Sequence, residues 1–205
     1  VFERVAGTWT EVAKLTASDA QANSVFGWRV SVSGGRAIVG AQKEDGGPGS
    51  PRPDAGAAYV FERDGGGNWD EVAKLTASDA QASDLFGSHV SISGDRAVIG
   101  APQEDGGAGD PLPDAGAAYV FQRSGGGSWS QVVKLMANDA QAGDTFGASA
   151  DMDADRLIVG MSLGSASSAT GAAYIFERDG GGSWDQVARL TARAPQPDDK
   201  FGSMV

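Results

Sequence analysis

The sequence predicts an all-β protein, a β-propeller built of four-stranded antiparallel blades, with about three and a half blades in this chain. One motif occurs four times in the same order at a spacing of about 60 residues, which indicates a repeat architecture. Within each copy, short segments alternate between polar and apolar residues and are separated by Gly-rich turns. No stretch shows helical periodicity over a useful length.

The repeated motif begins with a Val-Phe-Glu-Arg run and continues through a Gly-rich stretch to a Trp. It then leads to a Phe-Gly pair, an Ile-Val-Gly-Ala run and a Gly-Ala-Ala-Tyr run. We therefore expect one repeat array over residues 1–205, with copies near 1–59, 60–119 and 120–174 and a partial copy at 175–205. The Trp and Phe-Gly positions are Trp9, Trp69, Trp129 and Trp184, and Phe26-Gly27, Phe86-Gly87, Phe146-Gly147 and Phe201-Gly202.

Each copy is predicted to form four short strands, denoted A to D. Strand A is Val90 to Ser93, and Gly94-Asp95 forms a two-residue hairpin turn to strand B at Arg96 to Ala101. Strand C, at Gly116 to Arg123, is apolar on both faces, which is typical of a strand that is covered on both sides. Strand D is represented by Trp69 to Ala77.

A four-stranded unit of this size cannot bury both of its faces alone, so the copies must stack on one another. Radial stacking gives a propeller and linear stacking gives a solenoid, and four-stranded units favour the propeller. The chain supplies strands C and D, three complete blades, and the start of another strand A at Phe201 to Val205. More of the same protein could cover the open ends, or a second copy could complete the ring by self-association.

The composition excludes several classes of function. A net charge of -11 and a pI near 4.4 argue against nucleic-acid binding, and suit either divalent cations or simple solubility. No run approaches the roughly 20 apolar residues of a membrane span, so we expect no membrane insertion. The absence of Cys excludes disulfides and thiolate chemistry. No secretion signal is present and the chain begins inside an expected strand, so we expect a mature or excised part of a longer protein.

The residues at three points of the repeat resemble the FG-GAP repeat, the blade unit of the integrin α-subunit head, which is also abundant in secreted bacterial proteins. The second copy carries Phe86-Gly87, then Ile99-Gly100-Ala101-Pro102, then Gly116 to Phe121. The resemblance covers essentially the whole chain. It implies a β-propeller, placement outside the cell or on its surface, and binding of a protein or carbohydrate ligand.

The chain departs from the calcium-binding members of that family. Those members carry an Asp-rich loop of about nine residues between strands A and B, where this chain has only Gly34-Gly35, Gly94-Asp95 or Ala154-Asp155. A two-residue turn cannot wrap the roughly six to eight oxygens that Ca²⁺ requires. The family's calcium site is therefore expected to be missing from these blades.

A different metal site is one interpretation of the third copy. Asp151, Asp153 and Asp155 alternate along strand A and its turn, so their carboxylates could converge on a cation such as Ca²⁺. The alternative is a polar strand face that ends in a turn Asp, since the other copies carry Ser at the first two positions. Clustered carboxylates repel one another, so either a cation or the neighbouring Arg156 would have to offset them.

Long acidic loops join strands B and C in two copies, at Glu44 to Asp54 and Glu104 to Asp114. Binding residues are disproportionately placed on loops that a rigid scaffold supports, which makes Asp105, Asp110 and Asp114 candidates for ligand binding. The alternative is that these carboxylates are solvated and cap backbone amides in turns.

The residues that follow each Phe-Gly pair differ between copies, and strand A is expected to be the innermost strand of its blade. Trp28 and Arg29 could stack on a sugar or pair with a carboxylate near the central channel, and His89 holds the matching place in the second copy. The alternative is neutral drift at a half-exposed position. His89 is the only histidine, and no nucleophile motif accompanies it, so we expect no enzyme activity.

Two functional hypotheses remain at this point. The first is a non-enzymatic extracellular binding module that recognises a protein or a glycan on a propeller scaffold. The second is a structural or assembly protein whose incomplete propeller closes by self-association. No cofactor is required by either hypothesis, and Ca²⁺ is kept as a candidate only.

Overall fold

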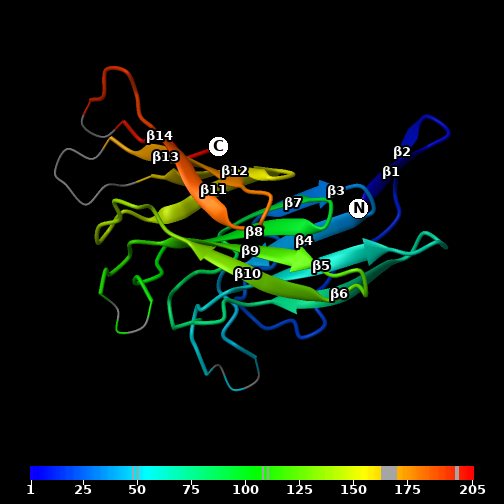
Figure 1. Cartoon of the computed structure of the whole chain (residues 1–205). Coiled ribbons are helices and arrows are strands. Elements are labelled where there is room, and N and C mark those ends of the chain that lie inside the picture. The colour runs from blue at the N-terminus through cyan, green and yellow to red at the C-terminus, as the bar shows by residue number, and fades with distance from the viewer. Residues whose placement is uncertain (48, 50, 108, 110, 163–169, 197–198) are drawn as a thin grey trace.

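The computed structural model describes the chain except for residues 48, 50, 108, 110, 163–169 and 197–198. The described residues form three four-stranded antiparallel sheets and one two-stranded sheet, as shown in Figure 1. In that part of the chain, no helix has the length and hydrophobicity needed to cross a bilayer. The strands are β1 (Phe2–Val5) and β2 (Thr8–Glu11); β3 (Val30–Ser33), β4 (Arg36–Ala41), β5 (Ala57–Arg63) and β6 (Trp69–Leu75); β7 (His89–Ser93), β8 (Arg96–Ala101), β9 (Ala117–Arg123) and β10 (Trp129–Leu135); and β11 (Phe146–Asp153), β12 (Arg156–Met161), β13 (Ala172–Arg178) and β14 (Trp184–Leu190).

Each four-stranded sheet is one propeller blade with its strands in chain order, as the sequence predicts. We call the sheets β3–β6, β7–β10 and β11–β14 blades 1, 2 and 3. The two-residue turns predicted between strands A and B are present, and Gly34 and Gly94 both have φ of 58°, a left-handed conformation that glycine adopts without strain. Strand boundaries differ from the predicted ones by one or two residues, as at Leu75, where the fourth strand ends before Ala77.

The blades pack face to face, and the core lies between them. Ile38 and Val60 of blade 1 are fully buried in one apolar cluster with Val90 and Ile92 of blade 2. Val98 and Val120 of blade 2 meet Met152 and other residues of blade 3 in the same way. The middle strands of a blade are therefore covered on both faces, which explains their continuous apolar sequence.

The Phe-Gly segment joins each blade to the one before it. The Phe86 amide donates to the Ala55 carbonyl at 2.9 Å, and Phe86 pairs with Gly56 in an isolated parallel bridge. Its ring is fully buried and meets the edge of Tyr119 at a centroid distance of 5.5 Å. The same bridges recur at Phe146 and Phe201.

Glycines at this joint bring two backbones together. A Cβ placed on Gly40 would lie 2.2 Å from the carbonyl oxygen of Gly87, and a Cβ on Gly100 would lie 2.0 Å from that of Gly147. Real Cβ atoms do not approach backbone oxygen this closely, so only glycine fits. The Gly of the Gly-Ala run and the Gly of the next Phe-Gly pair are thus one structural unit.

The two ends of the array are incomplete. The hairpin β1–β2 corresponds to strands C and D of a preceding blade and projects from the side of blade 1 (Figure 1). At the other end, Phe201 pairs with Gly171 and so begins the strand A position of a following blade. The predicted count of about three and a half blades is confirmed.

We expect Gly100→Ala to destabilise the fold by at least about 2 kcal/mol, because the added methyl overlaps the Gly147 carbonyl and must push two blades apart. Urea unfolding followed by tryptophan fluorescence measures the change. Gly65→Ala is the matched control, since a Cβ there meets nothing within 4 Å. Equal effects of the two substitutions would show that the joint does not require glycine.

Candidate functional site

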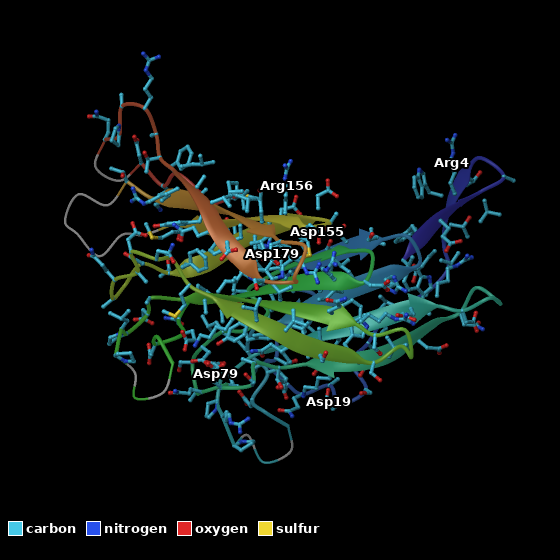
Figure 2. All side chains as sticks on the ribbon, viewed as in Figure 1. Arg4, Asp19, Asp79, Asp155, Arg156 and Asp179 are labelled. Atoms are coloured by element: carbon cyan, nitrogen blue, oxygen red, sulfur yellow. The ribbon has the colours of Figure 1, made fainter. Side chains whose placement is uncertain are left out.

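The long loops of the blades gather at one end of the strands, and we call this end the loop edge. In an antiparallel blade, the connections between strands B and C and between one blade and the next must lie together. The loop edge comprises the described parts of residues 17–29, 42–56, 77–88, 102–116 and 137–145. Figure 2 shows Asp19 and Asp79 on this side of the molecule, away from Asp155 and Asp179 in the short turns.

A repeated polar cluster anchors the loop edge to the blades. The Tyr59 hydroxyl donates to Asp19 at 2.7 Å, and the Lys74 ammonium donates to the same carboxylate at 2.6 Å. Lys74 also pairs at 2.9 Å with Glu44, whose side chain is 1% exposed. Glu44 in turn accepts from the Gly46 and Gly47 amides. Burial disfavours the charge on Lys74, but its hydrogen bonds to the two carboxylates outweigh burial and raise its pKa.

The cluster recurs in the other blades with one change. In blade 2, Tyr119 and Lys134 contact Asp79, and Lys134 also contacts Glu104. In blade 3, Arg189 replaces the lysine and contacts both Asp139 and Tyr174. These residues hold the inter-blade segment against strands C and D, so their role is structural and the loops they anchor have fixed starting points. In the first two clusters the Tyr follows the loop Asp by 40 residues and the Lys follows it by 55 residues. This repeated spacing is the sequence signal that could have revealed the cluster.

Asp84 is an unusual carboxylate at the loop edge. Asp84 is 2% exposed, and its carboxylate accepts a hydrogen bond from the Gln81 amide at 2.7 Å. Burial, reinforced by repulsion from Glu104 and Asp105, outweighs that hydrogen bond and raises the pKa of Asp84 to about 6. The first copy carries Ser24 at this place, so the carboxylate is not required for the loop conformation.

Trp28, Arg29 and His89 lie together where strand A begins at the loop edge. The Trp28 side chain is 44% exposed, and the Arg29 guanidinium lies 5.3 Å from its ring centroid. His89 is half-buried between blades 2 and 3, where Nδ1 accepts from the Ala150 amide at 3.2 Å. Burial and the nearby Arg29 charge lower the pKa of His89. The exposed members of this group are therefore Trp28 and Arg29.

The acidic loop candidates have partners within their own loops. Asp105 Oδ1 accepts from the Asp114 amide at 2.8 Å, and Asp45 closes the equivalent loop by accepting from Asp54 at 2.9 Å. Asp105 is thus a backbone cap, as the alternative interpretation proposed, and it is partly buried, whereas Asp114 is exposed. Asp110 lies outside the described residues.

The three carboxylates predicted as a metal site have separate surroundings. Asp151 accepts from the Ser91 hydroxyl at 2.7 Å on the inner strand of blade 3, and Asp153 is exposed two residues further along. Asp155 lies in the turn and pairs with Arg96 at 3.1 Å. Within the described residues, no group of three His, Asp or Glu side chains is arranged to hold a metal ion. The metal site stays a prediction, and Ca²⁺ binding with it.

The comparisons with known proteins agree with the repeat. A family model described as the FG-GAP repeat matches residues 9–61, 69–121 and 129–176. Each match runs from the Trp of one blade to strand C of the next.

Solved structures give a similarity of fold at low sequence identity. A crystal structure of a protein from Lactobacillus plantarum aligns with a TM-score of 0.54 and 14% identity, over 95% of this chain and 51% of that one. Sqt1 from Chaetomium thermophilum aligns with a TM-score of 0.48 and 11% identity, over 89% of this chain and 41% of that one. The chain thus spans about half the length of these structures or less. No curated protein sequence matches.

We expect Asp84→Asn to raise the free energy of unfolding at pH 7 by up to about 3 kcal/mol. Because the folded-state pKa of Asp84, about 6, exceeds its ordinary value of 3.8, the native state binds the proton more tightly and loses stability as pH rises through that interval. The variant should remove this loss. Urea unfolding at several pH values between about 4 and 7 measures it, with the exposed Asp70→Asn as control. Identical profiles for wild type and D84N would contradict the raised pKa.

Proposed function

The chain belongs to the FG-GAP repeat family, and from that premise we propose that it is a non-enzymatic module that binds a glycan or protein ligand outside the cell. FG-GAP repeats are typical of extracellular proteins, and this supports the proposed location. The proposal places the ligand at the loop edge, around Trp28 and Arg29 and beside the acidic loops.

The exposed tryptophan is the observation that carries the proposal. Trp28 is 44% exposed, and the same place after Phe-Gly holds Ser88 and Ala148 in the next two copies, so the repeat does not require a large aromatic side chain there. A large aromatic side chain that is not required by the repeat, and that lies in water, favours a contact surface. Its ring face with the adjacent Arg29 offers stacking and hydrogen bonds to a sugar ring or to an aromatic or acidic peptide side chain.

The surrounding carboxylates give this surface its chemical character. Asp105 closes its loop by accepting from the Asp114 amide at 2.8 Å, so the exposed carboxylate of Asp114 is attached to backbone that is held in place before any ligand arrives. Carboxylates that are held by a rigid scaffold accept hydrogen bonds from sugar hydroxyls at little cost in conformational entropy. An exposed ring on the same edge of the molecule as such acceptors supports a carbohydrate ligand in particular.

The absence of enzyme activity is part of the proposal. The Nδ1 atom of His89, the single histidine, accepts a hydrogen bond from the Ala150 amide between two blades. General acid–base chemistry needs a group that can reach a substrate proton, and this ring nitrogen is already occupied. The described residues give no arrangement of a nucleophile with a base around it.

A glycan array probed with the labelled chain, in Ca²⁺ and again in chelator, tests the proposal. For the glycan that binds most strongly, we expect Trp28→Ala to weaken binding by about tenfold or more in calorimetry, because the stacking face is removed. Trp9→Ala is the matched control, since Trp9 is also exposed but lies on the projecting hairpin. Undiminished binding by W28A would place the ligand elsewhere, and loss of binding in chelator would make Ca²⁺ part of the site.

A further inference from the structure

The short turns between strands A and B lie at the end of the strands opposite the loop edge, and we call this end the turn edge. Figure 2 shows Asp155 and Asp179 on this side of the molecule. Side chains of neighbouring blades meet here in ion pairs. Between blades 1 and 2, Arg36 Nε lies 2.9 Å from the carboxylate of Glu62. Arg123 holds both oxygens of the same carboxylate, with Nε at 2.6 Å and Nη2 at 3.1 Å.

This arrangement favours a charged carboxylate. Burial acts to raise the pKa of Glu62, but the hydrogen bonds from Arg36 and Arg123 outweigh burial and hold the pKa below its ordinary value. Asp95 supplies a second acid, 3.2 Å from Arg36 and 3.9 Å from Arg123. At the first interface, two guanidinium groups are therefore matched by two carboxylates.

The interface between blades 2 and 3 has the same two arginines but only one of the acids. Arg96 and Arg178 hold the places of the arginines at the first interface, and we call them the arginine pair. Asp155 lies 3.1 Å from Arg96 and 3.6 Å from Arg178. Gln122 stands opposite Arg96 in the strand ladder, at the place that Glu62 takes in blade 1. A neutral amide thus replaces the carboxylate that two arginines hold at the first interface.

One donor of the arginine pair has no acceptor. Arg96 Nε is buried and has no hydrogen-bond partner among the described residues, so the Gln122 amide does not act in place of Glu62. Arg123 Nε also falls outside hydrogen-bond geometry, but it has the counter-charge of Glu62 at 2.6 Å. A buried N–H without an acceptor is costly and rare in folded proteins, and it marks a place where a bound group completes the contacts.

Asp179 is the other acid near the arginine pair. Its Oδ1 accepts from the Gly181 and Ser183 amides, each at 2.8 Å. These backbone hydrogen bonds, above all the one from Ser183, lower the pKa of Asp179, and the charge of Arg178 adds a smaller contribution. In the part of the chain that the structure describes, Asp179 forms no ion pair with either member of the arginine pair. Its carboxylate therefore stabilises its own loop and does not replace Glu62.

A ligand in water can reach the arginine pair. The side chains of Arg96 and Arg178 are 21% and 25% exposed, and that of Asp155 is 55% exposed. Gln122 is partly exposed as well, so its side chain can turn toward water when a ligand enters. The site is thus partly desolvated but open, which strengthens a charge-assisted hydrogen bond without blocking entry.

We propose that the arginine pair binds a carboxylate from outside the chain, of the kind that an acidic peptide side chain carries, in the position that Glu62 fills at the first interface. Glu62 shows that two guanidinium groups in this setting hold one carboxylate, with a bidentate contact from one of them. Since that carboxylate is carried by a glutamate side chain on an extended strand, the ligand is an acidic side chain of a peptide or a partner protein.

This site is separate from the proposed binding surface at the loop edge. It uses none of the residues around Trp28 and Arg29, and it lies at the other end of the strands. The proposal therefore stands or falls independently of a glycan or protein ligand at Trp28.

A titration of the ¹⁵N-labelled full chain with N-acetylglutamate amide, a probe with one carboxylate, tests the proposal by the nuclear magnetic resonance signals of the arginine Nε–H groups. The ionic strength is held constant with sodium chloride. We expect a saturable shift of the Arg96 signal, identified by its absence from the R96K variant, with a Kd of about 10 mM. Gln122→Glu should weaken this response by at least about tenfold, because its own carboxylate then occupies the arginine pair.

Gln131→Glu is the matched control, since it adds the same charge to the same blade. Gln131 contacts Ser78, and Glu71 makes the equivalent contacts with Ser18 in the preceding copy, so the repeat itself shows that glutamate fits there. Q131E should keep the response of Arg96. The reverse change, Glu62→Gln, should give the Arg36 signal a saturable response of its own, because it reproduces the second interface at the first.

An Arg96 signal that does not move, or that moves equally with sodium chloride, would overturn the proposal. A response that persists in Q122E, or one that Q131E removes to the same extent, would show that the arginine pair is not the site. Tighter binding of glucuronate than of N-acetylglutamate amide would overturn the assignment to an acidic peptide side chain in favour of a sugar acid. The dispersion of the amide signals in each spectrum checks that the variants are folded.

Discussion

The backbone contact between glycines at the blade joint is the constraint on which the rest of the structure depends. Gly100 can approach the Gly147 carbonyl only because it has no side chain, and this approach sets the separation of neighbouring blades. Phe146 fills the space beside it, and its ring meets Tyr174 and Phe176 edge-on at 5.5 and 6.0 Å. At that separation the apolar strands of adjacent blades interdigitate, and the serines of one inner strand reach the amides of the next.

The fixed joint also determines which residues at the loop edge can vary between copies. The inter-blade segment is held twice, by the Phe bridge and by the Tyr–Asp–Lys cluster, so the residues that follow the Phe-Gly pair can differ from copy to copy without loss of the joint. Trp28, Ser88 and Ala148 show this variation at one structural position. Removing Lys74 would leave the carboxylate of Glu44 buried without its counter-charge, so the cluster is costly to lose for a structural reason alone. Variable residues that follow rigid anchors are an arrangement that supports a binding surface.

Much of the fold could be predicted from the sequence because its signals are local. Period-two alternation and the Gly94-Asp95 turn define a hairpin without reference to any distant residue. The partners of Asp19 could not be predicted in this way, since Tyr59 and Lys74 are 40 and 55 residues away and meet it only after the blades pack. The burial of Asp84 likewise depends on the neighbouring loop. The acidic alternation at Asp151 and Asp153 suggested a metal because strand periodicity reveals which residues share a face, but not which neighbouring strand faces them.

Apolar burial and charge contribute differently at the blade interfaces. Gln122 stands where an acid pairs with arginine at the first interface, yet the glycine joint is as close between blades 2 and 3 as between blades 1 and 2, and Phe146 is fully buried. The Glu–Arg pair is therefore not required to hold two blades together, although Arg96 of blade 2 still pairs with Asp155 of blade 3 at 3.1 Å. Covering two apolar side chains such as Val90 and Ile92 is worth roughly 1.5–3 kcal/mol for each side chain, which exceeds the contribution of a typical exposed ion pair. The charged residues between blades then act mainly on the register of one blade on the next, because like charges in the wrong alignment repel.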